Sequence, residues 1–192
     1  MVKIKLKIIV KKLLFPYYKM RYRVNTRGGV FIGRFAKIAN PKQVYLGKEA
    51  SIGKYCLLCP FHNAKIIFGN NVSLGWFSRV TAVNEVVIGD NVITGPNVFI
   101  GDYNHRYEDI TKPISKQGIT SPATKVVIGE DSWIGTNAVI CGNVVVGRHV
   151  VIGAGSFVNK DIPDYSVAVG NPAKVVKKYN FETKTWERVT NK

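Results

Sequence analysis

One long polar stretch holds the side chain best suited to acid–base chemistry. Residues 101–118 read GDYNHRYEDITKPISKQG and include His105, one of only three histidines in the chain. An imidazole exchanges a proton near neutral pH, so a positioned histidine can activate a hydroxyl group as a nucleophile. A lone loop histidine is more commonly a solvated surface residue, which is how we interpret His62 and His149. The place of His105 in the chain decides between these two interpretations.

The cysteines point to no metal or redox centre. Cys56 and Cys59 form the sequence CLLC, but the chain has no second CxxC pair and no histidine pair at zinc-ligand spacing. We therefore expect no metal site, and we expect Cys56 to lie in the core, where cysteines are commonly buried. Three cysteines without an evident secretory leader make no disulfide framework and fit a reducing cytoplasm.

A six-residue repeat flanks the polar stretch on both sides. Pairs such as Ile88-Gly89 and Ile134-Gly135 lead each unit, and twelve of the 18 glycines follow such a leading position. A period of six does not match the helical period of 3.6, but it fits a short strand followed by a turn. Three units would make a triangular coil of about 18 residues, and stacked coils would pair about 4.8 Å apart. The sequence therefore predicts an all-β fold, a parallel β-helix, with its interior filled by the leading aliphatic residues and by Val92, Val98, Ala138, Val144, Val150 and Ser156.

The clearest interruption of the repeat is at residues 102–124. Loops of this length in compact domains are usually functional or disordered, and this one lacks the low-complexity composition of a disordered linker. We expect it to leave the prism and to carry His105 over a neighbouring surface. Asp102, Glu108 and Asp109 are near enough in sequence to orient the imidazole, and spacing does not choose among them.

Four stretches together resemble one enzyme family: the hexapeptide run, NHRY at its interruption, DSWIGTNAVI where it restarts and VNKDIPDYSVAVGNPAKVVKKY at its end. They are similar to the left-handed β-helix acyltransferases, in the branch of galactoside, maltose and nodulation acetyltransferases, and most closely to bacterial O-antigen and capsule O-acetyltransferases. The resemblance covers roughly residues 44–189. It implies a left-handed coil, a homotrimer with each active site between two solenoids, and acetyl-CoA as the acetyl donor.

The resemblance also implies roles for single residues. His105 would be the catalytic base that activates a sugar hydroxyl, and the backbone N–H of Thr136 would stabilise the oxyanion. Asn84, where the repeat slips by two residues, would line the acceptor pocket with Asn104 and Tyr107; simple turn or coil roles stay open for Asn84 and Thr136. The residues implied to contact coenzyme A are Trp133, Thr136, Gly153, Ala154, Asn159, Lys160, Lys174 and Lys177.

Two of these positions depart from the pattern. Lysines stand at 174 and 177, where relatives often have arginine, and a lysine attracts phosphate without the bidentate grip of a guanidinium. Trp133 could flank the pantetheine or simply pack against its neighbours.

Positive charge is concentrated near the start of the chain. The net charge is +16, and residues 1–48 contain 13 Lys or Arg and no acid. We expect a basic N-terminal arm at 1–25, the β-helix with its loop at 26–163, and a C-terminal helix and tail at 164–192. In that last part a helix would open at Pro172, and FETKTWERV would form a strand. The arm lacks an apolar run that could span a bilayer, so it either contacts an anionic membrane surface or caps the first coil.

These features favour a cytoplasmic enzyme, which would lie at the inner face of the cell membrane if its arm contacts lipid and does not only cap the first coil. We expect an O-acetyltransferase for a sugar hydroxyl of a bacterial surface polysaccharide or its precursor. The alternatives are N-acetylation of an amino-sugar nucleotide and a non-catalytic solenoid scaffold, which would have no use for a histidine-bearing loop. The basic arm matches no nucleic-acid recognition motif, so we expect no nucleic-acid partner.

Overall fold

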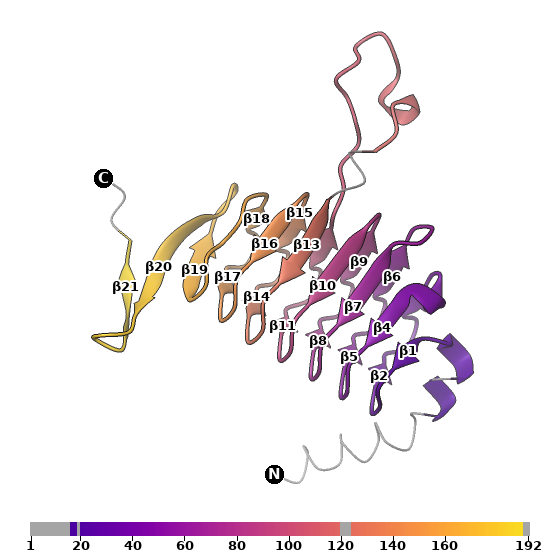
Figure 1. The fold of residues 1–192 in the computed structure, drawn as a ribbon, viewed down its shortest axis with the longest axis horizontal. Coiled ribbons are helices and arrows are strands. Elements are labelled where there is room, and N and C mark those ends of the chain that lie inside the picture. The colour runs from indigo at the N-terminus through magenta and orange to yellow at the C-terminus, as the bar shows by residue number, and fades with distance from the viewer. Residues whose placement is uncertain (1–15, 19, 120–123, 190–192) are drawn as a thin grey trace.

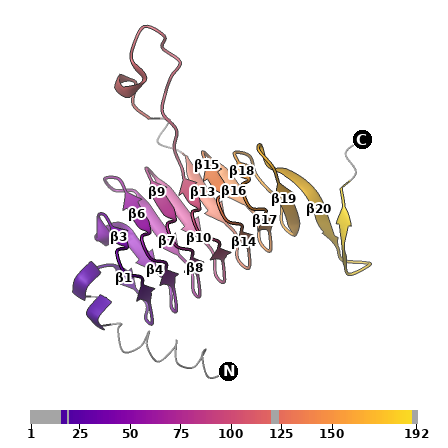
Figure 2. The ribbon, with the colours of Figure 1, turned by 180° about the vertical axis from the view of Figure 1, so that it is seen from behind.

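The chain forms a parallel β-helix of stacked, three-sided coils, as Figures 1 and 2 show. This computed structural model describes residues 16–18, 20–119 and 124–189. Each side of the prism is one sheet, called A, B or C below, in which strands of successive coils pair in parallel. The three turns that join the sheets in chain order are the A–B, B–C and C–A corners. The predicted parallel β-helix is confirmed.

The strands are short and are distributed evenly over the three sheets. Sheet A contains β1 (Asn25–Thr26), β4 (Val44–Leu46), β7 (Lys65–Phe68), β10 (Glu85–Ile88), β13 (Lys125–Ile128) and β16 (Val144–Val146). Sheet B contains β2 (Phe31–Ile32), β5 (Ser51–Ile52), β8 (Ser73–Leu74), β11 (Ile93–Thr94), β14 (Trp133–Ile134), β17 (Val151–Ile152), β19 (Ser166–Val169), β20 (Lys174–Asn180) and β21 (Thr185–Arg188). Sheet C contains β3 (Lys37–Ile38), β6 (Leu57–Pro60), β9 (Arg79–Ala82), β12 (Phe99–Gly101), β15 (Val139–Cys141) and β18 (Phe157–Val158). Two 3-10 helices, η1 (Pro41–Gln43) and η2 (Ile114–Lys116), lie outside the sheets, and residues 16–18 and 20–22 are helical.

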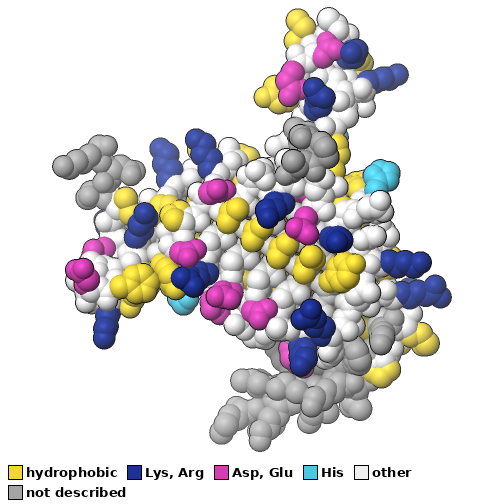
Figure 3. All heavy atoms as spheres, viewed as in Figure 1, with side chains coloured by type: hydrophobic (Ala, Val, Ile, Leu, Met, Phe, Trp, Pro, Cys, Tyr) yellow, Lys and Arg dark blue, Asp and Glu magenta, His cyan; other side chains and the backbone are white. Residues whose placement is uncertain are grey.

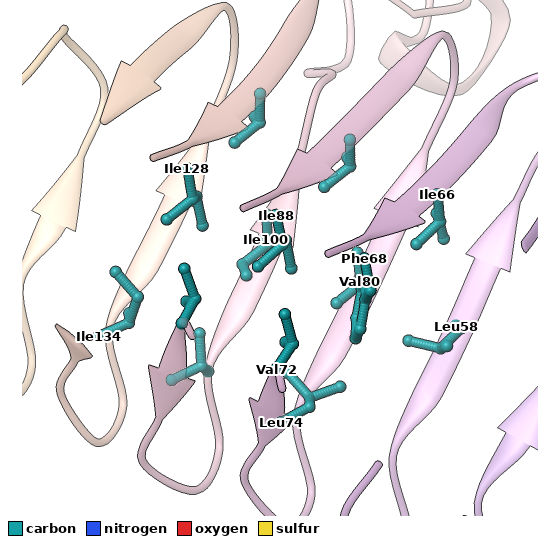
Figure 4. Close-up of a cluster of buried hydrophobic side chains, with 14 of the residues drawn as sticks. Leu58, Ile66, Phe68, Val72, Leu74, Val80, Ile88, Ile100, Ile128 and Ile134 are labelled. Atoms are coloured by element: carbon teal, nitrogen blue, oxygen red, sulfur yellow. The ribbon is translucent and has the colours of Figure 1, made fainter. Parts of the chain in front are cut away.

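Aliphatic side chains fill the prism from end to end. Figure 4 shows them pointing inward from all three sheets, in rows that follow the strand register, such as Phe68, Ile88 and Ile128. Cys56 is 1% exposed, and its thiol donates to the Gly75 carbonyl at 3.0 Å, so its predicted burial is confirmed. The predicted small interior residues are each at most 1% exposed: Val92, Val98, Ala138, Val144, Val150 and Ser156.

The repeat glycines let the corners of neighbouring coils stack. A side chain at Gly75 would overlap the carbonyl of Gly95 in the next coil, so only glycine fits there. Each B–C corner also places one residue in the left-handed backbone region; Asn97 (φ 57°) and Asn137 (φ 60°) are examples, and asparagine adopts this conformation readily.

The outer face of sheet A has no patch of side chains with the same charge. Figure 3 shows a row of hydrophobic side chains along it, and the strand register aligns Tyr45, Ile67, Val87, Val127 and Val145. Beside this row, Lys65, Glu85 and Lys125 are in register and alternate in charge. This face is therefore poorly suited to a strongly charged ligand.

The prediction of a helix that begins at Pro172 is wrong. Residues 170–173 form a turn, and Lys174–Asn180 is strand β20, which runs antiparallel between β19 and β21. The Ala173 N–H donates to the Phe157 carbonyl at 2.7 Å, which fixes the turn against sheet C. Val175 and Val176 are β-branched and favour a strand, so pairing with β19 outweighs the local signal of Pro172. The strand predicted within FETKTWERV is confirmed as β21.

The described part of the N-terminal arm covers the open first coil. Tyr18 is 7% exposed and belongs to the core cluster, with its ring centroid 6.1 Å from that of Phe31. Tyr22 packs against the same cluster. Residues 1–15 lie outside the described residues. Within the part that the structure describes, no helix is long and apolar enough to cross a membrane.

Candidate active site

The described part of the polar loop, residues 102–119, forms a stalk with His105 at its root. It leaves the prism after β12 at the C–A corner and projects away from the sheets (Figure 1). His105 forms an antiparallel bridge with Ile119, and the Arg106 N–H donates to the Gly118 carbonyl at 3.1 Å, so the root is closed by paired backbone. The Tyr103 ring meets the imidazole edge-on, with centroids 6.2 Å apart. The exposed imidazole is thus held on a fixed base.

Two of the three carboxylates expected near His105 serve the loop itself. Asp109 pairs with the Lys112 ammonium at 2.8 Å, and this bond is the largest of those that hold the pKa of Asp109 below its usual value. Backbone N–H groups of the loop bind Glu108 and lower its pKa. Neither carboxylate bonds to the imidazole among the contacts of the described residues. Tyr107, between them and His105, is 68% exposed.

The third carboxylate, Asp102, clamps the preceding coil. It is fully buried, and it accepts hydrogen bonds from the backbone N–H groups of Val83 (2.7 Å), Asn84 (2.7 Å) and Glu85 (2.8 Å). One coil earlier, Lys65 occupies the position of Glu85, and its N–H donates to a backbone carbonyl at 2.9 Å. Because the chain leaves the prism directly after Asp102, its carboxylate replaces the carbonyl that a regular coil would supply. Asp102 therefore joins the Asn84 turn to the root of the loop.

The C–A corner gathers the residues predicted to contact the acceptor. The half-buried side chain of Asn84 donates to the Thr124 hydroxyl at 3.1 Å, where the loop rejoins the prism. The Cys141 thiol donates to the Asn104 side-chain oxygen at 3.3 Å. Burial, followed by the nearby Asp102 charge, raises the pKa of Cys141, so the thiol stays neutral. Asn84 and Asn104 therefore flank the root that presents the imidazole.

Most of the predicted cofactor residues lie elsewhere, on sheet B and the B–C corner. Thr136 and Ala154 follow paired strands and stack on this corner, and the Gly155 N–H donates to the Thr136 carbonyl at 2.8 Å. Trp133 is 51% exposed on the outer face of sheet B, in a row that continues to Lys177. Lys174 pairs with Val169 at the end of β19, and a side chain at Gly153 would overlap Val169.

Among the described residues, backbone amides without an acceptor recur along this corner, at Arg34, Lys54, Trp76, Thr136 and Ala154. At Thr136 and Ala154 the corner also has small side chains, so a ligand could approach the backbone closely. This arrangement suits the stabilisation of a negatively charged oxygen.

The predicted site is therefore divided between two corners of the same coils. Asn159 and Lys160 are exposed after β18 on the C–A corner, two coils beyond the loop. Sheet C lies between that corner and Thr136, so a single chain does not bring His105 to the Thr136 amide. An open groove of about 700 Å³ at the N-terminal end of sheet A includes Tyr45 and Lys65 but no loop residue. No group of three or more metal-ligating side chains occurs in the described ranges.

Comparison with known proteins agrees with this architecture. The family model "Bacterial transferase hexapeptide (six repeats)" matches residues 125–160. The chain is 34% identical over 94% of its length to a probable acetyltransferase of Mycobacterium tuberculosis, strain H37Rv, of which it spans 63%. It is 34% identical over 79% of its length to the Escherichia coli K12 protein named "Putative lipopolysaccharide biosynthesis O-acetyl transferase WbbJ", of which it spans 80%.

Solved structures show the same fold. AntD, an N-acyltransferase from Bacillus cereus solved in complex with dTDP and 3-hydroxybutyryl-CoA, superposes with a TM-score of 0.74. The match covers 88% of this chain and 89% of that one at 20% identity, which establishes the fold alone. The fold and the relatives above agree on one class of protein, the transferases built from hexapeptide repeats. The chain belongs to the hexapeptide-repeat acyltransferase family, and the resemblance stated from its motifs is confirmed.

Proposed function

We propose that this chain is an acetyl-CoA-dependent O-acetyltransferase that acts on a sugar hydroxyl of a bacterial surface polysaccharide or its lipid-linked precursor. The observation that carries the proposal is the exposed imidazole of His105, held by a paired loop root beside Asn84 and Asn104. The name of the E. coli relative supports the O-acetyl and lipopolysaccharide parts of the proposal.

A homotrimer would complete the site. In a threefold arrangement the C–A corner of one chain can face the B–C corner of the next. The imidazole of His105 would then meet the free amide of Thr136 from the neighbouring chain. Neither corner alone holds both groups, so each site would need two copies.

The proposed reaction is a direct transfer. The imidazole of His105 takes the proton of the acceptor hydroxyl as its oxygen attacks the thioester carbonyl carbon. The carbonyl oxygen becomes an oxyanion that accepts a hydrogen bond from the Thr136 N–H, a contact that typically contributes 10²- to 10³-fold in kcat. The carbon–sulfur bond then breaks, and the departing thiolate takes the proton from the imidazolium. No covalent enzyme intermediate is needed.

Basic side chains would hold the donor away from the reacting atoms. Lys174 and Lys177 lie on β20, beside the corner that carries Thr136 and Ala154, and both are exposed. Their ammonium groups can attract the phosphates of coenzyme A. Asn159 and Lys160, on the other corner, would contact a coenzyme bound to the neighbouring chain.

The test replaces one histidine and uses another as its control. His105→Ala should lower kcat by ~10²-fold or more, with little change in KM for acetyl-CoA. His149→Ala is the matched control, because His149 is also exposed but stacks on Trp186 at the far end of the molecule, with ring centroids 6.4 Å apart. Acetyl transfer to purified polysaccharide repeats and to a nucleotide-linked amino sugar would be compared, with the product identified by NMR. A His105→Ala enzyme with more than half of the wild-type kcat would contradict the proposal.

The basic arm would place the enzyme at the inner face of the cell membrane. Tyr18 and Tyr22 pack against the core cluster at the first coil. Residues 1–15 combine five lysines with apolar side chains and contain no acid. Segments of this composition bind anionic lipid surfaces through charge and apolar burial.

A further inference from the structure

One edge of the prism changes character along its length. In every coil the B–C corner has two outward residues after its glycine, and neither position is Asp or Glu in any coil. The first three coils place aromatic or basic residues there, and the next three place small or polar ones. In chain order the pairs are Arg34-Phe35, Lys54-Tyr55, Trp76-Phe77, Pro96-Asn97, Thr136-Asn137 and Ala154-Gly155. We call the first three pairs the aromatic corner.

The rings of the aromatic corner form an exposed stack. Neighbouring centroids of Phe35, Tyr55 and Phe77 are 5.0 Å apart, and the rings are 53%, 49% and 56% exposed. All three residues have left-handed backbone, which bulky side chains seldom adopt. Asn97 and Asn137 occupy the same position in the next coils and bond to each other at 2.7 Å. The fold therefore accepts asparagine here and does not require aromatic rings.

Two cations lie over rings of the aromatic corner. The Arg34 guanidinium lies 4.6 Å from the centre of the Phe35 ring, and the Lys54 ammonium lies 5.0 Å from the centre of the Trp76 ring. Trp76 is itself 54% exposed. Because no carboxylate occupies the corner positions, these cations have no acid partner within the corner and can attract an external anion.

The aromatic corner ends where the transfer site begins. The loop leaves from the coil that contains Pro96 and Asn97, the first coil with small corner residues. On the C-terminal side, small residues expose the free amides of Thr136 and Ala154. The same corner therefore offers close backbone approach on one side of the site and large apolar and cationic side chains on the other.

We propose that the aromatic corner binds the acceptor as an anionic saccharide chain that extends beyond the reacting sugar. The proposed substrate is thus an oligomer or polymer with carboxylate or phosphate groups, rather than a single sugar; this inference rests on the proposed function. The C–H groups of sugar rings pack on aromatic side chains, whose faces carry negative charge density, while Arg34 and Lys54 pair with the acid groups. Because the corner faces the neighbouring chain in the proposed trimer, the saccharide would run along the cleft between copies.

The test first measures binding without acetyl-CoA. The probes are fragments of an acidic surface polysaccharide, cut to defined lengths, and the same fragments neutralised by reduction of their carboxylates or by hydrolytic removal of their phosphates. Wild type should bind long acidic fragments about tenfold more tightly than neutralised or single-sugar ones, and the difference should shrink at high salt. The Phe35→Asn, Tyr55→Asn and Phe77→Asn triple variant should lose this preference, because it extends the asparagine row without disturbing the backbone. Phe181→Asn is the control, an aromatic residue 63% exposed at the opposite end.

Kinetics then separate this inference from the proposed function. The triple variant should raise KM about tenfold for long acceptors, with KM for acetyl-CoA and for a single-sugar acceptor unchanged. Binding of acidic fragments without any acetyl transfer would support the aromatic corner and refute the proposed function. Transfer with a KM independent of acceptor length, in wild type and variant alike, would overturn the inference and leave the proposed function standing.

Two other occupants of the corner would also be revealed. If the triple variant dissociates into monomers while fragment binding is unchanged, the corner is an interface between copies and the inference is overturned. If it loses binding to phosphatidylglycerol vesicles but not to the fragments, the partner is a membrane and the inference is likewise overturned.

Discussion

Replacing Asp102 with Asn would test how the loop is joined to the prism. The substitution keeps the size of the buried side chain but leaves one acceptor oxygen where the carboxylate has two. That oxygen can serve Val83, or Asn84 and Glu85, but not all three N–H groups. An unsatisfied buried donor costs about 1–3 kcal/mol, and the remaining bonds lose their charge assistance. We therefore expect a loss of roughly 3 kcal/mol in the free energy of unfolding, or about 6–12 °C in Tm for a chain of this size.

Kinetics would show whether this clamp also positions the acceptor. Asp102→Asn should raise KM for the acceptor, because the Asn84 turn is released, and should leave KM for acetyl-CoA near its wild-type value. Asp90→Asn is the matched control, since the half-buried Asp90 carboxylate accepts the Asn70 N–H at 2.7 Å on the A–B corner, away from the loop. Thermal melting by circular dichroism and initial rates would be measured for both variants. If the two variants melt alike and neither changes KM for the acceptor, the clamp does not position the acceptor.

Three further outcomes are expected. Lys160→Ala combined with Lys174→Ala should raise KM for acetyl-CoA with little change in KM for the acceptor. This rise in KM should be smaller with 3′-dephospho donors. A change confined to KM for the acceptor would show that the donor groove is misplaced. Iodoacetamide at neutral pH should modify the half-exposed Cys59 before Cys141, because burial raises the pKa of Cys141 and keeps its thiol protonated; mass spectrometry showing the reverse order would contradict this burial. Removing residues 1–15 should abolish low-salt binding to anionic vesicles, to which each basic residue contributes about 1 kcal/mol, while turnover of a soluble acceptor survives; equal binding to neutral vesicles would argue against the charge mechanism.

The β-helix could be predicted from the sequence because the six-residue repeat recurs in coil after coil. Glycine at positions such as Gly75 is required by contact with the next coil, and the small interior residues are set by the width of the prism. The failure at Pro172 has a different origin. A proline that can open a helix is a local signal, whereas Lys174–Asn180 is a strand because β19 and β21 lie beside it.

The site was only partly predictable, because spacing along the chain does not say which corner a residue occupies. Asp102 was expected as one of three partners for His105, yet its carboxylate binds the backbone of another coil. The available signal was its position as the first residue after the repeat stops. The aromatic corner had a signal as well, since Phe35, Tyr55 and Phe77 each follow a repeat glycine by two residues.

The reversal of direction at β20 has a consequence for self-association. A parallel solenoid that ended on a bare coil could add another molecule end to end, and repeated addition would build a fibre. Here β20 runs antiparallel to β19 and β21 runs antiparallel to β20, so the last part of sheet B is an antiparallel meander. Its outer strand is fully exposed and includes Glu187 and Arg188, and charged side chains on an edge strand oppose further pairing. With Tyr18 packed at the other end, both termini of the prism are closed to polymerisation, so copies would associate side by side.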